Sequence, residues 1–294
     1  MHDGLTGTVV GLALAAAAGM LGCAHPPPAP AGADQSEERQ LATANGWLLG
    51  RSLGLGPGLP VVLVHGVGGN HHVFDPQLQD LRGGRRVVAF DQRGCGGSAD
   101  APGGDYDLET RVRDLSNLLD AIRLEPVVLV GHGTGAQVVA RYAERNPDRV
   151  RGLVLVNPVS GNAEAGRVAD LPEDRFRPAV DGWLGTLLEG AKPETVELVR
   201  GSVQVARVPA MRSMLADAAG KDLSGSLAAY PGPVLILATP DEAIPGPLRS
   251  GIEVKRLSGG SHWSPLDSAD EVNAALREFL RPLDAAARPP RRSG

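Results

Sequence analysis

The sequence predicts an α/β fold in which a mostly parallel, twisted sheet carries helices on both faces. Short apolar runs rich in Val, Leu and Ile recur without polar alternation, which is typical of strands buried on both faces of a parallel sheet. Helical patterns alternate with these runs, as in right-handed β-α-β units. Residues 158–230 show helical patterns but no strand-like run. We therefore expect a helical cap inserted between strands, over the carboxyl edge of the sheet, where ligands bind in open α/β folds.

The elements can be placed in chain order. Residues 45–53 predict an edge strand whose hairpin turn is residues 54–60. Asp107 is a suitable N-cap for an amphipathic helix over residues 108–122. The predicted buried strands are residues 61–64, 86–90, 126–130, 150–156, 234–238 and 252–254, and the other predicted helices are residues 136–145, 180–189, 193–205, 209–219 and 270–280.

Length and composition indicate one main domain. Of the 294 residues, 42% are hydrophobic, enough for one sizeable core, which we assign to residues 45–157 and 231–283. Residues 284–294 form a basic tail without a packing pattern. The net charge of −5 gives no basic footprint for nucleic acid. We expect a monomer that takes a small-molecule substrate or ligand under the cap, with no nucleic-acid partner.

The first residues predict an export signal. An apolar run over residues 9–21 is too short to span a bilayer as a stable anchor. It leads into Met20-Leu21-Gly22-Cys23, which precedes a Pro- and Ala-rich tether over residues 24–44. This arrangement resembles a bacterial lipoprotein signal over residues 1–23, which implies a lipid on Cys23 and a membrane anchor in the cell envelope. Residues 1–8 lack the Lys and Arg that a signal peptide carries at its start, and the alternatives are an ordinary secretory signal or a mis-assigned start codon.

Glycine-rich turns follow several of the predicted strands, and a similar loop precedes the last helix. They are His65-Gly66-Val67-Gly68-Gly69, Asp91-Gln92-Arg93-Gly94-Cys95-Gly96-Gly97-Ser98, Gly131-His132-Gly133-Thr134-Gly135 and Gly259-Gly260-Ser261-His262-Trp263. In this order they resemble the oxyanion loop, the D-x-R-G-x-G-x-S turn, the nucleophile elbow and the histidine loop of the α/β-hydrolase superfamily in its capped form. The resemblance covers roughly residues 46–283. It implies the α/β-hydrolase fold and hydrolysis of a small ester-like substrate.

The resemblance also implies roles for individual residues. His262 matches the histidine that takes the proton of the nucleophile. The backbone N–H groups of Val67 and Thr134 match the two oxyanion donors. Because the backbone supplies these donors, the loss of a side chain at the elbow leaves them in place.

The acid that orients His262 should follow the strand at residues 234–238, where Asp241 and Glu242 are both available. The usual spacing to a following proline favours Asp241, whereas counting from the start of the strand favours Glu242. We expect Asp241 to accept the hydrogen bond from His262.

The elbow has glycine where the nucleophile belongs. In the G-x-S-x-G pattern the central residue is serine, and here it is Gly133. Glycine relieves the strained backbone of this corner but supplies no Oγ. The histidine and its acid would then activate water directly as a general base, and cofactor-free lyase or oxygenase chemistry belongs to the same hypothesis. The alternative is a non-catalytic ligand-binding or interaction protein, as in N-myc downstream-regulated relatives that have lost the serine.

The sequence indicates neither a cofactor nor a metal site. His65, His71 and His72 have no carboxylate or cysteine partner at ligand spacing. The glycines that follow His65 do not form a phosphate-binding loop, because the Walker lysine is missing. The hydroxyl of Thr134 is a poor substitute nucleophile, since a shift of one residue at a tight corner turns the side chain away from the base.

Overall fold

The structure is a computed structural model, and it describes residues 38–43, 46–220 and 223–287. The predicted lipoprotein signal with Cys23, most of the tether and the last residues of the tail lie outside the described residues, so the lipid anchor stays a prediction. Among the helices of the described ranges, none combines the length and the apolar character that a bilayer span requires.

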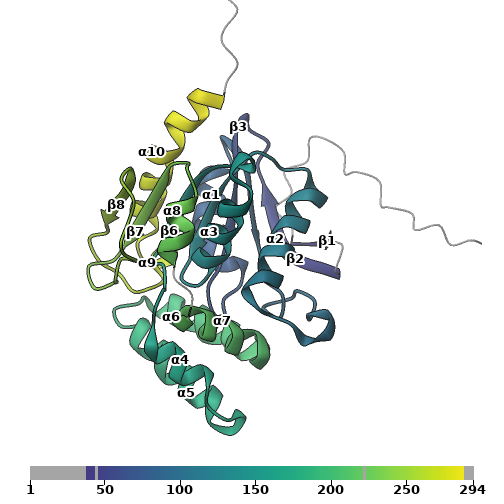
Figure 1. Cartoon of the computed structure of the whole chain (residues 1–294), viewed down its shortest axis with the longest axis vertical. Coiled ribbons are helices and arrows are strands. Elements are labelled where there is room, and N and C mark those ends of the chain that lie inside the picture. Colours follow the sequence, from purple (N-terminus) through teal and green to yellow (C-terminus); the bar gives the residue numbers. More distant parts are fainter. Residues whose placement is uncertain (1–37, 44–45, 221–222, 288–294) are drawn as a thin grey trace, which may run out of the picture. The chain divides into compact units, whose positions relative to one another are not determined.

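Within the described residues, eight strands form the central sheet, in the order β1-β2-β4-β3-β5-β6-β7-β8 (Figure 1). β2 pairs antiparallel with β1 and β4, whereas the neighbours from β4 to β8 are all parallel. The predicted mostly parallel sheet is therefore confirmed. The strands are β1 (Arg39–Thr43), β2 (Gly46–Leu53), β3 (Gly58–Val64), β4 (Arg85–Phe90), β5 (Val127–His132), β6 (Val150–Val156), β7 (Val234–Ala238) and β8 (Ile252–Arg256).

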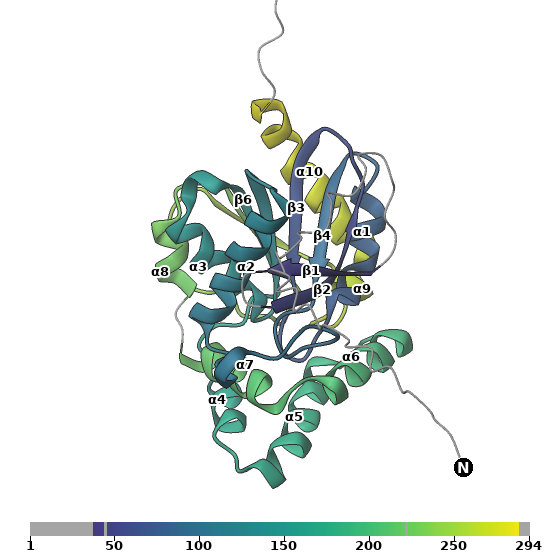
Figure 2. The same cartoon turned by 90° about the vertical axis from the view of Figure 1, so that its right-hand side faces the viewer.

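Helices cover both faces of this sheet. Successive strand residues point to opposite faces, so Val61 and Leu63 pack with α1 and α10, while Val62 and Val64 pack with α2, α3 and α8. Figure 2 shows the two groups of helices on opposite sides of the sheet. The helices are α1 (Asp75–Leu81), α2 (Leu108–Ile122), α3 (Gly135–Arg145), α4 (Ala163–Ala169), α5 (Glu173–Leu187), α6 (Pro193–Val205), α7 (Val208–Gly220), α8 (Leu223–Ala229), α9 (Ser264–Asp267) and α10 (Ala269–Ala287).

The cap consists of α4 to α7, which lie between β6 and β7 in the sequence and gather beside one end of the sheet (Figures 1 and 2). α8 differs from the prediction, which included it in the cap. Its buried Leu223 and Leu227 belong to the apolar layer that α3 forms with the sheet. The last helix of the predicted cap is therefore part of the core.

The amino-terminal part of the sheet also differs from the prediction. β2 pairs with β1 and β4 and does not fold back on β3 through residues 54–60. β1 lies within residues 24–44, which were predicted to form a tether. The strand was missed because its mostly exposed side chains give no apolar signal in the sequence.

The predicted tail begins too early. Asp284 accepts hydrogen bonds from the backbone of Leu59 and from the guanidinium of Arg85, each at 2.8 Å. These contacts fasten the last turns of α10 to the sheet, so the helix extends to Ala287.

Candidate active site

The strand registers bring the predicted turns together at the carboxyl edge of the sheet. Gly131 of β5 pairs with Val64 of β3 on one side and with Leu155 of β6 on the other. The oxyanion loop after β3 and the elbow after β5 are therefore neighbours. The ends of β6 and β7 are also level, since Val156 pairs with Leu237.

His262 is fixed by its backbone in the loop between β8 and α9. Its carbonyl accepts hydrogen bonds from the Asn157 amide (2.7 Å) and from Nε2 of His132 (2.9 Å). Its own N–H donates to the carbonyl of Leu187 in α5 at 3.2 Å. The imidazole is 7% exposed and packs edge-on against Trp263, with ring centroids 5.3 Å apart. The sheet, the elbow and the cap thus all contribute to placing this histidine.

The carboxylate beside His262 is that of Glu242. Nδ1 of His262 donates a hydrogen bond to Oε1 of Glu242, whose side chain is 19% exposed. The expectation that Asp241 accepts this bond is wrong, because Asp241 is exposed on the same turn. The physical reason is the turn itself: the N–H of Glu242 donates to the carbonyl of Thr239 at 3.2 Å, which directs the longer side chain inward.

Two residues that the sequence analysis did not identify hold the acid loop in place. Asn157 accepts a hydrogen bond from the N–H of Thr239 (2.9 Å) through the same side chain that binds the His262 carbonyl. Arg256 of β8 donates to the carbonyls of Thr239 (2.7 Å) and Glu242 (2.6 Å). The only sequence signal for Asn157 is its position directly after a buried strand.

The elbow has the backbone of a nucleophile turn. Gly133 has a φ of +55°, in the left-handed region that favours glycine. A Cβ on Gly131 would lie 2.6 Å from Cα of Ala136, and one on Gly135 would clash with the carbonyl oxygen of Val64. These two positions therefore require glycine for the strand and helix to pass closely. A Cβ on Gly133 would lie 3.0 Å from Nε2 of His262, so the imidazole faces the bare corner.

The expected oxyanion donors lie next to this corner. A Cβ on Gly66 would be 3.3 Å from the backbone N of Thr134, which shows how closely the loop after β3 approaches the elbow. Val67 and Thr134 both line the same cavity as His262. Within the described part of the chain, neither backbone N–H has a hydrogen-bond acceptor. The hydroxyl of Thr134 is also buried there without a partner.

His65 and His132 support the site as neutral rings. The N–H of Gln92 donates to Nε2 of His65 at 2.8 Å, so Nδ1 of His65 carries the proton and donates to the carbonyl of Gly66 (2.8 Å). Burial lowers the pKa of His65. Burial, followed by the proximity of His262, lowers the pKa of His132 to about 3. His65 therefore braces the oxyanion loop, and His132 stays uncharged beside His262.

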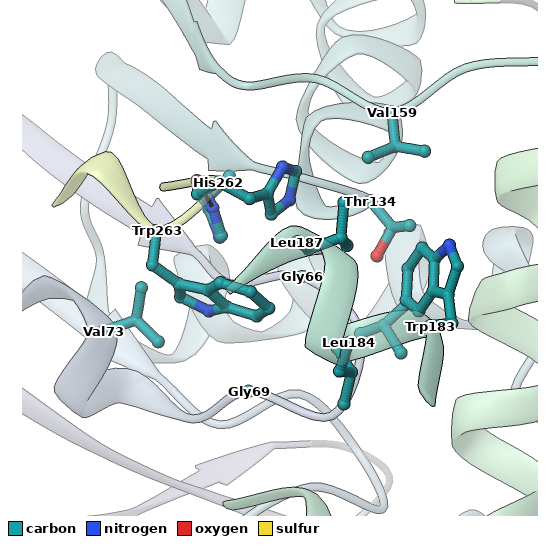
Figure 3. Close-up of a pocket in the computed structure, with 12 residues that line it drawn as sticks. Gly66, Gly69, Val73, Thr134, Val159, Trp183, Leu184, Leu187, His262 and Trp263 are labelled. Atoms are coloured by element: carbon teal, nitrogen blue, oxygen red, sulfur yellow. Dashed lines mark hydrogen bonds between the residues drawn. The ribbon is translucent and has the colours of Figure 1, made fainter. Parts of the chain in front are cut away.

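A small cavity lies between these groups and the cap (Figure 3). Its volume is about 10 Å³, which is close to the room that one water molecule needs. Trp183, Leu184 and Leu187 of α5 close it from the cap side. Among the described residues that line it, none is Asp, Glu, Lys or Arg. The site favours an uncharged and largely apolar molecule.

The structure brings His262, Gly133, Val67 and Thr134 close together, and the carboxylate beside the imidazole is that of Glu242 and not that of Asp241. The aromatic and aliphatic residues of α5 that close the cavity had no sequence signal, because their spacing is that of any buried helix face.

Comparisons with known proteins agree with this geometry. A family model described as "Alpha/beta hydrolase family" matches residues 61–275. A candidate carbamate hydrolase of Variovorax paradoxus, RutD, is 31% identical over 253 residues, which cover 79% of this chain and 95% of that protein.

Solved structures show the same fold. A hydrolase from Pseudomonas aeruginosa is 26% identical, with a TM-score of 0.71 over 83% of this chain and 98% of the other. A serine-to-glycine mutant of the N-acyl homoserine lactonase AidH, in complex with N-hexanoyl homoserine lactone, is 22% identical, with a TM-score of 0.67 over 84% and 98% of the two chains. At that identity the lactonase supports the fold alone.

Proposed function

The chain belongs to the alpha/beta hydrolase family, and from this premise we propose that it hydrolyses a small, uncharged, ester-like substrate with water in place of the missing serine. The observation that carries the proposal is the direction of the His262 imidazole. Its Nε2 lies 3.0 Å from the position that a Cβ on Gly133 would occupy. A base that faces an empty nucleophile position can act on a water molecule held there.

His262 and Glu242 supply the base. Because Nδ1–H donates to the Glu242 carboxylate, the lone pair of the neutral ring is on Nε2. In the proposed reaction, Nε2 takes a proton from water while the water oxygen bonds to the acyl carbon. Glu242 stabilises the imidazolium that forms. When the tetrahedral intermediate collapses, the bond to the leaving oxygen breaks and Nε2 returns the proton to it, which yields a carboxylic acid and an alcohol.

The backbone N–H groups of Val67 and Thr134 would receive the negative oxygen of the intermediate. Both are free of other acceptors within the described residues, so they are available to a ligand. Such donors stabilise the charge that develops on the oxygen, and one of them is typically worth about 10²–10³-fold in rate. The unpaired hydroxyl of Thr134 offers a further contact to a polar atom of the substrate.

The cap determines which substrates fit. The cavity has room for about one water molecule, which is less than an ester needs, so we expect α5 to move away from the sheet when an ester enters. The apolar lining from Trp183, Leu184 and Leu187 favours short acyl chains or small rings without charge. A relative that is named as a candidate carbamate hydrolase supports attack on an acyl carbon.

Glu242→Gln tests the proposal against a matched neighbour, Asp241→Asn. Loss of the Glu242 charge should lower kcat/KM for short p-nitrophenyl esters by about 10²–10⁴-fold. Without the carboxylate, the imidazolium is no longer stabilised and the imidazole ring is no longer held in position. Asp241→Asn should leave kcat/KM within about twofold, since this side chain is exposed and away from the ring. Equal effects of the two substitutions would remove Glu242 from the mechanism.

The second candidate function is ligand binding without turnover, which the apolar cavity and the missing side chain at Gly133 favour. Trp183 and Trp263 line the cavity, so ligand entry should change their fluorescence. A fluorescence change on adding a short ester, with no acid released above buffer, would favour this function over hydrolysis.

A further inference from the structure

A histidine pair with a carboxylate lies outside the cavity. His71 and His72 begin the short 3-10 turn η1 (His71–Phe74), and Glu38 directly precedes β1. Nε2 of His71 lies 3.4 Å and Nε2 of His72 3.2 Å from the same oxygen, Oε1 of Glu38. All three atoms lie within 4.8 Å of one another. Metal–ligand bonds of about 2.0–2.1 Å in tetrahedral geometry place ligand atoms about 3.3 Å apart, so both separations from Glu38 fit a shared ion.

The other nitrogen of each ring is held by a second carboxylate. Nδ1 of His71 donates to Asp91 (2.8 Å), and Nδ1 of His72 donates to Asp75 (2.9 Å). Metal-binding histidines are commonly oriented in this way, because a carboxylate on the far nitrogen fixes the tautomer and makes the near nitrogen more basic. In neutral rings, Nε2 of each histidine therefore carries a lone pair, and both Nε2 atoms lie near the Glu38 carboxylate. Three acceptor atoms this close repel one another unless a cation or a proton on one of the rings lies between them.

An independent observation also points to a ligand. His71 is 1% exposed, and its Nε2 is buried without a hydrogen-bond partner among the described residues. Buried polar atoms without partners are rare in folded proteins. The supporting carboxylates are themselves fixed: Asp75 accepts a hydrogen bond from Arg51 at 2.6 Å, and Asp91 accepts one from the N–H of Gly97 at 2.8 Å.

We propose that Glu38, His71 and His72 bind a divalent transition-metal ion, for which Zn²⁺ is the best match. Two imidazoles and one carboxylate suit Zn²⁺, whereas Ca²⁺ and Mg²⁺ prefer ligand sets made only of oxygen. The sequence analysis found no carboxylate for this histidine pair, because Glu38 lies far upstream and is brought near only by the pairing of β1 with β2.

The ion would link the residue before β1 to η1 and, through the bond between His71 and Asp91, to the turn after β4 that supports the oxyanion loop. Asp91, which holds His71, is followed by Gln92, whose N–H binds His65 under the oxyanion loop. None of the three ligands lines the cavity, so the role that follows from this position is structural. Metal binding should therefore stabilise the fold and should not be required for the chemistry at His262.

Zinc titration of the full-length chain tests the proposal. The protein is purified in mild detergent without a histidine tag, stripped with a chelator and titrated with ZnCl₂ by calorimetry. Bound zinc is counted by elemental analysis. We expect one ion per chain and a higher unfolding temperature with zinc. Co²⁺ in the same site should show the visible absorption of a tetrahedral or five-coordinate ion.

Glu38→Gln and His72→Gln are the informative variants. Both side chains are more than one-third exposed, so their substitution should not prevent folding, whereas His71 is buried. Each should weaken zinc binding by about tenfold or more and abolish the thermal shift, and Glu164→Gln, an exposed carboxylate on α4, should change neither. The proposal is overturned if the wild type takes up no stoichiometric zinc, or if both variants bind it as the wild type does.

Discussion

His262→Ala is expected to lower kcat/KM for short p-nitrophenyl esters by about 10²–10⁴-fold, the usual contribution of a general base. The reason is positional. Nε2 of His262 is the basic atom that faces Gly133. In the neighbouring ring of His132, burial lowers the pKa to about 3, and Nε2–H donates a hydrogen bond to the His262 carbonyl. His132 therefore cannot take over the role. Initial rates at saturating and limiting ester, with the buffer rate subtracted, measure the effect.

The control for this variant is a measurement that shows whether it is still folded. The backbone carbonyl and N–H of residue 262 keep their partners after truncation to alanine, so the loop should retain its position. Thermal unfolding of His262→Ala should stay cooperative. A folded His262→Ala protein that hydrolyses the esters at the wild-type rate would exclude this imidazole as the base.

Gly133→Ser is expected to change the mechanism from direct attack by water to an acyl-enzyme. The new Oγ would stand beside Nε2 of His262 and the two N–H donors, and kcat/KM should rise by about 10²-fold or more, since a triad nucleophile accounts for a large part of hydrolase rates. The new Cβ would lie 3.0 Å from Nε2, so the ring has to retreat by a few tenths of an ångström. The left-handed backbone at φ +55° adds a cost of about 1–3 kcal/mol for a side chain.

Burst kinetics and intact mass separate the two mechanisms. Gly133→Ser should release p-nitrophenol in a burst close to one per chain, gain the mass of one acyl group and react with a fluorophosphonate probe. The wild type should show none of these. The double variant Gly133→Ser/His262→Ala should lose the burst. A folded Gly133→Ser protein that is neither acylated nor labelled would mean that the imidazole and the oxyanion loop do not form a working site.

Much of the fold could be predicted because its signals are local. The Val-rich strands are buried on both faces, and α2 begins where expected, with the Asp107 carboxylate accepting from the N–H of Thr110 at 2.6 Å. The elbow and the histidine loop were predictable for the same reason. Gly131 and Gly135 meet local steric demands at the elbow, and Gly260 of the histidine loop has a φ of +99°, which favours glycine.

The incorrect predictions concern features that depend on contacts between residues far apart in the sequence. Asp241 and Glu242 are adjacent carboxylates, and the turn bonded to Thr239 and held by Arg256 selects the second one. The position of Glu38 beside the histidine pair likewise depends on the pairing of β1 with β2, and the mostly polar sequence of β1 does not predict a strand. The two spacing rules disagree about the acid, and spacing along the chain gives no signal for Glu38.

Gly133→Ala examines the proposed position of the attacking water. A methyl group at the corner would lie 3.0 Å from Nε2 of His262 and would occupy the space in front of the base without supplying a nucleophile. The left-handed backbone costs about 1–3 kcal/mol, as for serine, which thermal unfolding can report separately. If water is activated at this corner, folded Gly133→Ala protein should lose ester hydrolysis nearly as completely as His262→Ala. Turnover at the wild-type rate would show that the water, and therefore the chemistry, is elsewhere.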